Sequence, residues 1–156
     1  MNRRGMFLVI VALVALLALP VAAQASVPRI FAGWHAPYTN SAVRPSRIGS
    51  TTGDGSAYFG AAPGKSGAIV WRTWNRKEAL ARGKYWIDDC IPTTAEGTFH
   101  GHWAKIRASR VRNGHYTRFS ARWYGGPDFW DAGTTLHVDR YRLTHWGGGL
   151  FWERYD

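Results

Sequence analysis

The dipeptide Asn113-Gly114, flanked on both sides by strand-like sequence, constrains the fold of this chain more than any other feature. A two-residue hairpin loop needs positive φ at both positions, and Asn followed by Gly adopts that geometry readily. The turn also fixes the pairing register, because it places Arg112 opposite His115. We therefore expect residues 104–112 and 115–123 to form one antiparallel hairpin.

This register assigns the two faces of the hairpin. Small residues meet larger ones on one face, which favours interdigitated packing and indicates the interior. The pairs are Ala108 with Phe119, Ile106 with Ala121, and Ala104 with Trp123. The other face is predicted to be a basic outer surface. It carries Lys105, Arg107, Arg118 and Arg122, with Val111 and Tyr116 near the turn.

The remaining sequence also favours strands. Residues 69–74, 84–88, 134–143 and 150–152 are rich in β-branched and aromatic types, and a short strand is expected near Tyr58 and Phe59. Residues 75–82 are expected to make one or two helical turns that end at Gly83. Short strands separated by Gly and Pro turns predict an all-β fold, a small antiparallel β-sandwich or barrel.

The first 25 residues have the layout of a secretory signal peptide. Arg3 and Arg4 precede an apolar run over residues 6–19, and Ala23-x-Ala25 supplies the small pair that signal peptidase recognises. The run is shorter than the roughly 20 residues of a spanning helix. We expect residues 1–25 to be removed, and residues 26–156 to form one secreted, extracellular domain without a transmembrane segment. Its part 26–67 is expected to be rich in loops.

Charge and residue types indicate the kind of partner. Removal of the leader takes Arg3 and Arg4 with it and leaves a net charge of +8. Arg outnumbers Lys in the remaining chain, and the guanidinium fork matches phosphate, sulfate and carboxylate geometry. The expected partner is an anionic polysaccharide or another cell-envelope polymer. No fold that reads nucleic acid sequence is visible, so specific nucleic acid binding is not expected.

Nine Trp residues are too many for a domain of this size to bury completely. We assign Trp71, Trp123 and one of Trp74 or Trp86 to the core. Trp34, Trp130, Trp146 and Trp152 stand beside Gly, Pro or polar residues and are expected to be exposed. The predicted binding surface comprises Lys105, Arg107, Arg118 and Arg122 together with Tyr116 and Trp130.

A spaced pattern between about Arg44 and Tyr124 resembles a family of small secreted proteins of unknown function that is common in actinobacteria. The matching residues are Gly53-Asp54-Gly55, Tyr58, Trp71-x-x-Trp74, Ala81-x-Gly83 and Cys90-x-Pro92-x-x-Ala95-x-Gly97. Members often carry further cysteines at the positions of Thr52 and Thr94 here, so the resemblance implies no disulfide within this chain. It implies a secreted β domain and no particular activity.

Several residues allow alternative functions. Asp88 and Asp89 are candidates for a general acid and base of a small secreted hydrolase, although neighbours in a strand point to opposite faces. His100 and His102 would share a face and provide an alternative hydrolase site, but no further ligand is marked by spacing, so neither a metal nor a cofactor is expected. Asp128 and Asp131 flank Phe129 and Trp130, which resembles a sugar-contacting edge of a glycosidase, but Pro127-Asp128 also suits an ordinary turn.

Cys90 is the one cysteine of the chain. It is either a small buried residue, a thiol that pairs between two chains, or a reactive thiol. No catalytic residue can be assigned, and the favoured hypothesis is a non-enzymatic module that binds an anionic polymer or carbohydrate at the cell surface. A hydrolase and a protein-binding inhibitor or effector are the alternatives. The oligomeric state is not encoded in any motif.

Overall fold

The structure, a computed structural model, describes residues 26–33, 40–49, 56–61, 64–91, 93, 95–126, 133–146 and 149–155. These residues form strands, turns and irregular segments and contain no helix. The strands are β1 Ile30–Phe31, β2 Ser41–Ala42, β3 Arg47–Ile48, β4 Ala57–Gly60, β5 Val70–Trp74, β6 Glu78–Asp88, β7 Phe99–Arg112, β8 His115–Gly125, β9 Thr135–Trp146 and β10 Gly149–Arg154.

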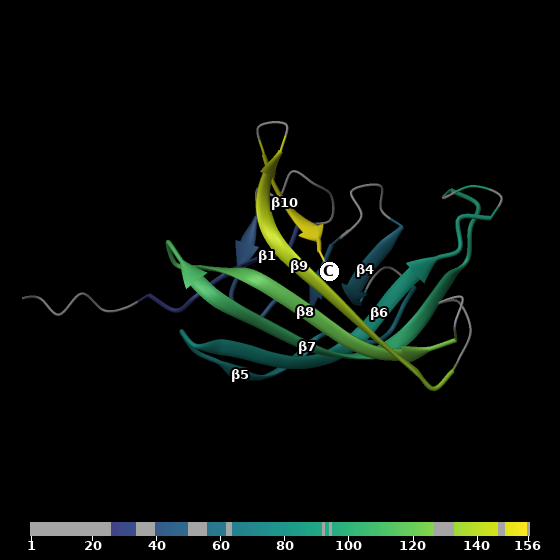
Figure 1. Cartoon of the computed structure of the whole chain (residues 1–156), viewed down its shortest axis with the longest axis horizontal. Helices are drawn as coiled ribbons and strands as arrows, with labels where there is room; N and C mark the ends of the chain where they lie inside the picture. The colour runs from purple at the N-terminus through teal and green to yellow at the C-terminus, as the bar shows by residue number, and fades with distance from the viewer. Residues whose placement is uncertain are drawn as a thin grey trace, which may run out of the picture.

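One antiparallel sheet dominates the molecule. Its order is β10-β9-β8-β7-β6-β4-β3, with β5 also paired to β6, while β1 and β2 form a separate small sheet. The long strands β6 to β9 curve side by side, and the sheet closes about half of a barrel (Figure 1). The prediction of an all-β antiparallel fold is confirmed, and the curvature lets the large sheet wrap around most of the core.

The β7–β8 hairpin has the predicted register. Arg112 pairs with His115, and the pairing continues through Ala108–Phe119 and Ile106–Ala121 to Ala104–Trp123. The φ angles of Asn113 and Gly114 are 49° and 75°, as a tight hairpin loop requires. The small and large members of these three pairs are all buried, so this face is the interior.

Aromatic rings fill the concave side of the sheet. Phe59 stacks on Tyr85 at 4.2 Å between ring centroids and meets Phe119 edge-on at 5.0 Å. The N-terminal segment closes one end of the core, because Arg29 N donates to Gly114 O and Tyr116 N donates to Arg29 O. The core therefore joins residues that are distant in the sequence.

The predicted helix over residues 75–82 is wrong. Asn75 instead forms a turn between β5 and β6, in which its Oδ1 accepts from the backbone N–H groups of Lys77 and Glu78. From Glu78 onward the chain is paired to β5 on one side and to β7 on the other. These two ladders outweigh a weak local preference for helix.

Trp152 was expected to be exposed but is buried. Its ring lies 5.8 Å from that of Phe119, and its Nε1 donates to Phe31 O at 3.1 Å. The curl of the sheet carries β10 over the core and provides both contacts. Of the other tryptophans, Trp123 and Trp86 are buried and Trp71 and Trp74 are partly buried at the core margin.

Tyr116, predicted to lie on the binding surface, is also buried. Its hydroxyl donates to Asn75 O, and its ring meets Trp74 edge-on at 5.3 Å. Arg110, on the opposite strand, has a φ of 56°, a left-handed conformation that interrupts the regular alternation of faces. Val111 and Tyr116 therefore turn toward the core at the end of the hairpin.

Candidate functional site

The outer face of the sheet brings cations from three strands into one row. Arg82 on β6 pairs with Lys105 on β7, and Lys105 pairs with Arg122 on β8. We call Arg82, Lys105 and Arg122 the basic row. Among the described residues, no carboxylate forms an ion pair with any of the three. Like charges directly opposite each other destabilise a sheet, so repulsion within the basic row lowers the stability of the folded protein.

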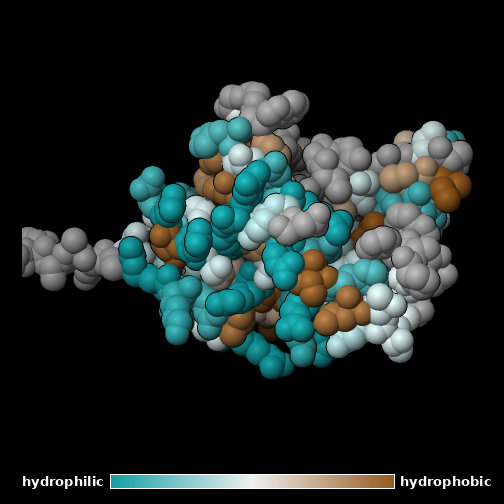
Figure 2. Space-filling view, viewed as in Figure 1, coloured by the Kyte–Doolittle hydropathy of each residue, from teal (hydrophilic) through white to brown (hydrophobic). Residues whose placement is uncertain are grey.

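Exposed aromatic side chains border the basic row. Trp103 and Tyr124 are 52% and 59% exposed, well above the exposure of most rings in this protein. With Leu136 they line a depression of about 360 Å³ that Arg82, Lys105 and Arg122 also line. Over strands β7 to β9 the surface is mostly hydrophilic, with a few hydrophobic groups among the polar atoms (Figure 2). This site combines positive charge with flat apolar surfaces.

Cations and rings alternate along β6 and β7. The Arg82 guanidinium carbon lies 4.8 Å from the Trp103 ring centroid, and Lys84 Nζ lies 6.0 Å from the same ring and 4.7 Å from the Trp86 ring. Cation–π contacts of this kind hold flexible charged heads in place. The side chains around Trp103 are thus partly preorganised, with cations held beside aromatic rings.

A glycine makes room for one of these rings. Trp86 pairs with Gly101, and a Cβ on Gly101 would come within 2.5 Å of the Trp86 ring. The indole of Trp86 therefore lies close against the backbone of β7. It is the ring that follows Trp103 on the far side of Lys84. A side chain at position 101 would displace Trp86 from this position.

The predicted binding residues divide into groups. Lys105 and Arg122 belong to the basic row. Arg107 is on the same face, but its Nε donates to Glu78 Oε2 at 2.9 Å. Arg118 lies farther along, 4.7 Å over the Tyr155 ring. Trp130, together with Trp34, Asp128 and Asp131, lies outside the described residues, as does the side chain of Trp146.

The carboxylates proposed for acid–base chemistry have separate structural partners. Asp88 is buried, and its Oδ1 accepts from Cys90 N at 3.0 Å. Asp89 Oδ1 accepts from the amides of Thr98 and Ile91, and Oδ2 accepts from His100 Nε2 at 3.1 Å. Hydrogen bonds from the Thr98 amide, His100 and the Ile91 amide hold the pKa of Asp89 below its usual range. Both residues thereby organise the loop between β6 and β7.

The two candidate histidines also differ in environment. His100 pairs with Asp89, whereas His102 is buried with its ring 4.8 Å from that of Trp123. Within the described ranges no group of three His, Cys, Asp or Glu side chains is arranged to hold a metal ion.

Cys90 is half-buried, has a φ of 55°, and its Sγ lies 3.6 Å from Asp88 O.

The residues that sequence reasoning missed are Arg82, Lys84, Trp103 and Tyr124. The helix expected over residues 75–82 includes Arg82, so the sequence did not predict that Arg82 pairs with Lys105. Trp103 and Tyr124 are each one position beyond the last inward pair, Ala104 with Trp123. Extending the same alternation by one residue would have placed both aromatic rings on the outer face.

Comparisons of the chain with protein-family models, with curated proteins and with solved structures find no match. In the part of the chain that the structure describes, no helix is long and apolar enough to cross a membrane.

Proposed function

We propose that this protein is a non-enzymatic module that binds an anionic polymer, such as an acidic polysaccharide of the cell envelope, through the basic row and the neighbouring rings of Trp103 and Tyr124. The observation that carries the proposal is the basic row itself, in which Arg82, Lys105 and Arg122 face one another across adjacent strands. An anion lying across the row would relieve the repulsion that the free protein has to tolerate.

The dimensions favour a polymer over a single small anion. Neighbouring strands lie about 4.8 Å apart, so the row spans about 10 Å across three strands. A chain with repeated anionic groups can contact several members of the row at once. The flat rings of Trp103 and Tyr124 offer surfaces on which the apolar faces of sugar rings can stack, and this supports a carbohydrate as the carrier of the charge.

The extracellular setting is part of the proposal. It is supported by the predicted leader over residues 1–25 and by the resemblance to small secreted actinobacterial proteins. Polyanions outside the cell include wall polymers and acidic glycans, which suits a basic domain. The hydrolase alternative has less support, because Asp88, Asp89 and His100 already have structural partners in the β6–β7 loop.

The test is a binding titration monitored by Trp fluorescence, with acidic polysaccharides, a neutral glycan and DNA at low and near-physiological salt. We expect saturable binding to an acidic polysaccharide that weakens as salt rises. The variant Arg82→Gln/Lys105→Gln/Arg122→Gln should lose most of this affinity. A matched control is Arg72→Gln/Arg76→Gln/Lys77→Gln, which removes the same charge from exposed positions on β5 and the β5–β6 turn.

Further measurements distinguish the contribution of the aromatic rings from that of the basic row. Trp103→Ser should weaken binding to an acidic polysaccharide more than binding to a simple polyanion without sugar rings. Equal loss of affinity in the two triple variants would mean that only net charge matters and would contradict the proposed site. Tighter binding to DNA than to every polysaccharide would also contradict it.

A further inference from the structure

A second cavity, of about 470 Å³, lies where β8 and β9 separate. The β8–β9 ladder runs from Gly125–Thr135 to Arg118–Arg142. Beyond that point the backbone N–H of Tyr116 on β8 donates a hydrogen bond to Arg29 O in the N-terminal segment, while β9 continues alongside β10. Two strands that are neighbours in the middle of the sheet therefore diverge and leave a wedge-shaped space.

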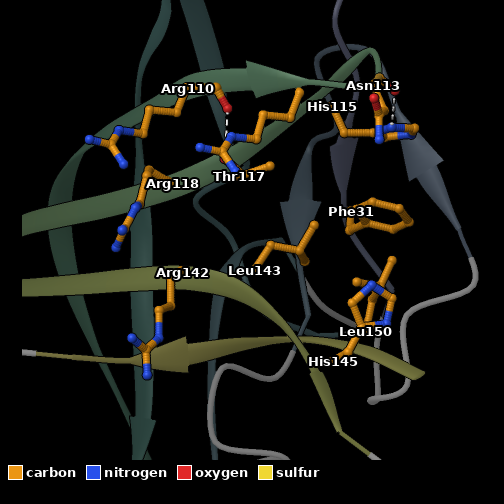
Figure 3. Close-up of a pocket in the computed structure, with 11 residues that line it drawn as sticks. Phe31, Arg110, Asn113, His115, Thr117, Arg118, Arg142, Leu143, His145 and Leu150 are labelled. Atoms are coloured by element: carbon orange, nitrogen blue, oxygen red, sulfur yellow. Dashed lines mark hydrogen bonds between the residues drawn. The ribbon is translucent and has the colours of Figure 1, made fainter. Parts of the chain in front are cut away.

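The cavity has a cationic side and an apolar side, and the apolar side also carries His115 and His145 (Figure 3). Arg110, Arg118 and Arg142 line one side in the view, and Phe31 and Leu150 lie across from them. Arg112 also lines the space, and the described lining residues include no carboxylate. A ligand that filled this cavity would need an anionic group at one end and an apolar group at the other.

Two arginines of the cationic side, Arg118 and Arg142, are held by contacts within the protein. Arg118 and Arg142 are directly opposite each other, and both guanidinium groups lie near the Tyr155 ring, at 4.7 Å and 6.0 Å from its centroid. Arg142 Nε donates to Glu153 Oε2. A guanidinium has five N–H donors, so this bond leaves the terminal nitrogens of Arg142 able to donate to an anion.

The apolar side is also held in position. Phe31 stacks on His115 with 4.6 Å between ring centroids. His115 Nδ1 donates to Asn113 O at 2.9 Å. Its Nε2 lies 3.2 Å from Ser41 Oγ, which accepts from Arg29 Nε at 3.0 Å and is thus able to donate its own proton to His115. These bonds fix the ring against which Phe31 rests.

We propose that this cavity is a binding site for an amphiphilic anion, a phosphate group joined to an alkyl or aryl chain. The phosphate contacts Arg110, Arg118 and Arg142, and the apolar chain covers Phe31, Leu143 and Leu150. The chemistry is shared by lipid headgroups and by small phosphate esters. The proposal is separate from the polymer site, because the basic row does not line this cavity.

Calorimetric titration of the purified protein with hexyl phosphate, hexanol and inorganic phosphate tests the site. Hexyl phosphate is expected to bind at least about tenfold more tightly than either of the other two, because each buried methylene adds to the affinity. Leu150→Asn should weaken the binding of hexyl phosphate several-fold and leave that of inorganic phosphate unchanged. Equal affinity for hexyl phosphate and inorganic phosphate would overturn the proposal.

A pair of charge variants locates the ligand. Arg110→Gln should weaken hexyl phosphate binding, whereas Arg122→Gln, which removes the same charge from the basic row, should not. Both side chains are exposed, so both variants are expected to fold, and circular dichroism checks this. An equal loss in the two variants would show attraction to net charge alone and would overturn the site. This result would leave the test of polymer binding unaffected.

A competition experiment identifies the source of the phosphate group. Vesicles of phosphatidic acid in phosphatidylcholine should displace hexyl phosphate if the site takes a lipid headgroup, and vesicles of phosphatidylcholine alone should not. Binding of hexyl phosphate that is unaffected by either vesicle would support a soluble phosphate ester. Displacement by both vesicles alike would indicate nonspecific partition and would overturn the proposal.

Discussion

The indole Nε1 of Trp123 donates to Asp139 Oδ2 at 2.7 Å, and both side chains are buried. The other carboxylate oxygen of Asp139 lies 2.7 Å from Arg154 Nη2, whose side chain is half-exposed. A buried carboxylate thus links a buried indole ring on β8 to a cation at the end of β10. This link fixes the position of the edge strand relative to the core.

Loss of the cation is expected to cost more than loss of the carboxylate charge. Arg154→Gln leaves Asp139 as a buried charge without its cation, and we expect a destabilisation of about 3 kcal/mol. Asp139→Asn retains an acceptor for Trp123 and lets Arg154 turn to solvent, so about 1 kcal/mol is expected. Urea denaturation of both variants measures the difference. A larger effect of Asp139→Asn would contradict this account.

The basic row is expected to lower stability at low salt. Lys105→Gln removes the central charge between Arg82 and Arg122, and we expect an increase in the free energy of unfolding of about 0.5 kcal/mol at low ionic strength. The gain should vanish near 1 M salt, where the Debye length is about 3 Å. Thermal denaturation across a salt series provides the measurement.

Arg107→Gln is the matched control for this prediction. It removes one charge from the same face, but Arg107 is paired with Glu78, so no gain in stability is expected. If both variants raised the stability equally, general charge repulsion and not the row would be responsible.

The stability of the β7–β8 turn is expected to be sensitive to substitution of Gly114 and tolerant of substitution of Asn113. Gly114→Ala places a side chain at a φ of 75° and should destabilise the protein by about 1–2 kcal/mol. Asn113→Gly keeps positive φ accessible and should change the stability by less than about 1 kcal/mol. Chemical denaturation of the two variants compares the effect of backbone strain at position 114 with the effect of losing the Asn113 side chain.

Acid is expected to weaken the β6–β7 loop through Asp89. The pKa of this carboxyl is lower in the folded protein than its ordinary value, so its contribution to stability is complete above about pH 4 and is lost as the pH falls through the folded pKa. Asp89→Asn should therefore be less stable than the unmodified protein at pH 6, with the difference shrinking toward pH 2.5. Urea denaturation at several pH values measures this trend.

Glu96→Gln provides the control for Asp89, because it removes a carboxylate from the same loop, where Glu96 Oε2 accepts a hydrogen bond from Thr93 Oγ1 at 3.0 Å. A pH trend of equal size in both variants would show that charge alone, and not the amides of Ile91 and Thr98, accounts for the effect.

Local sequence signals determined the central hairpin. Asn113-Gly114 specified the turn, and the strict alternation of strand side chains then gave the register, the buried pairs and the outward cations Lys105 and Arg122. The same alternation contained Trp103 and Tyr124, one residue farther on. These features were predictable because they depend only on neighbours in one hairpin.

The tertiary structure decided the features that the local alternation of the hairpin does not specify. Arg82 joins the basic row because β6 pairs with β7, and Trp152 is buried because the curled sheet carries β10 over the core. Tyr116 turns inward where Arg110 interrupts the alternation. The cavity between β8 and β9 forms because the N-terminal segment takes the place of β9 beside Tyr116. No local period encodes such contacts, since they arise only when the separate strands assemble into the curled sheet.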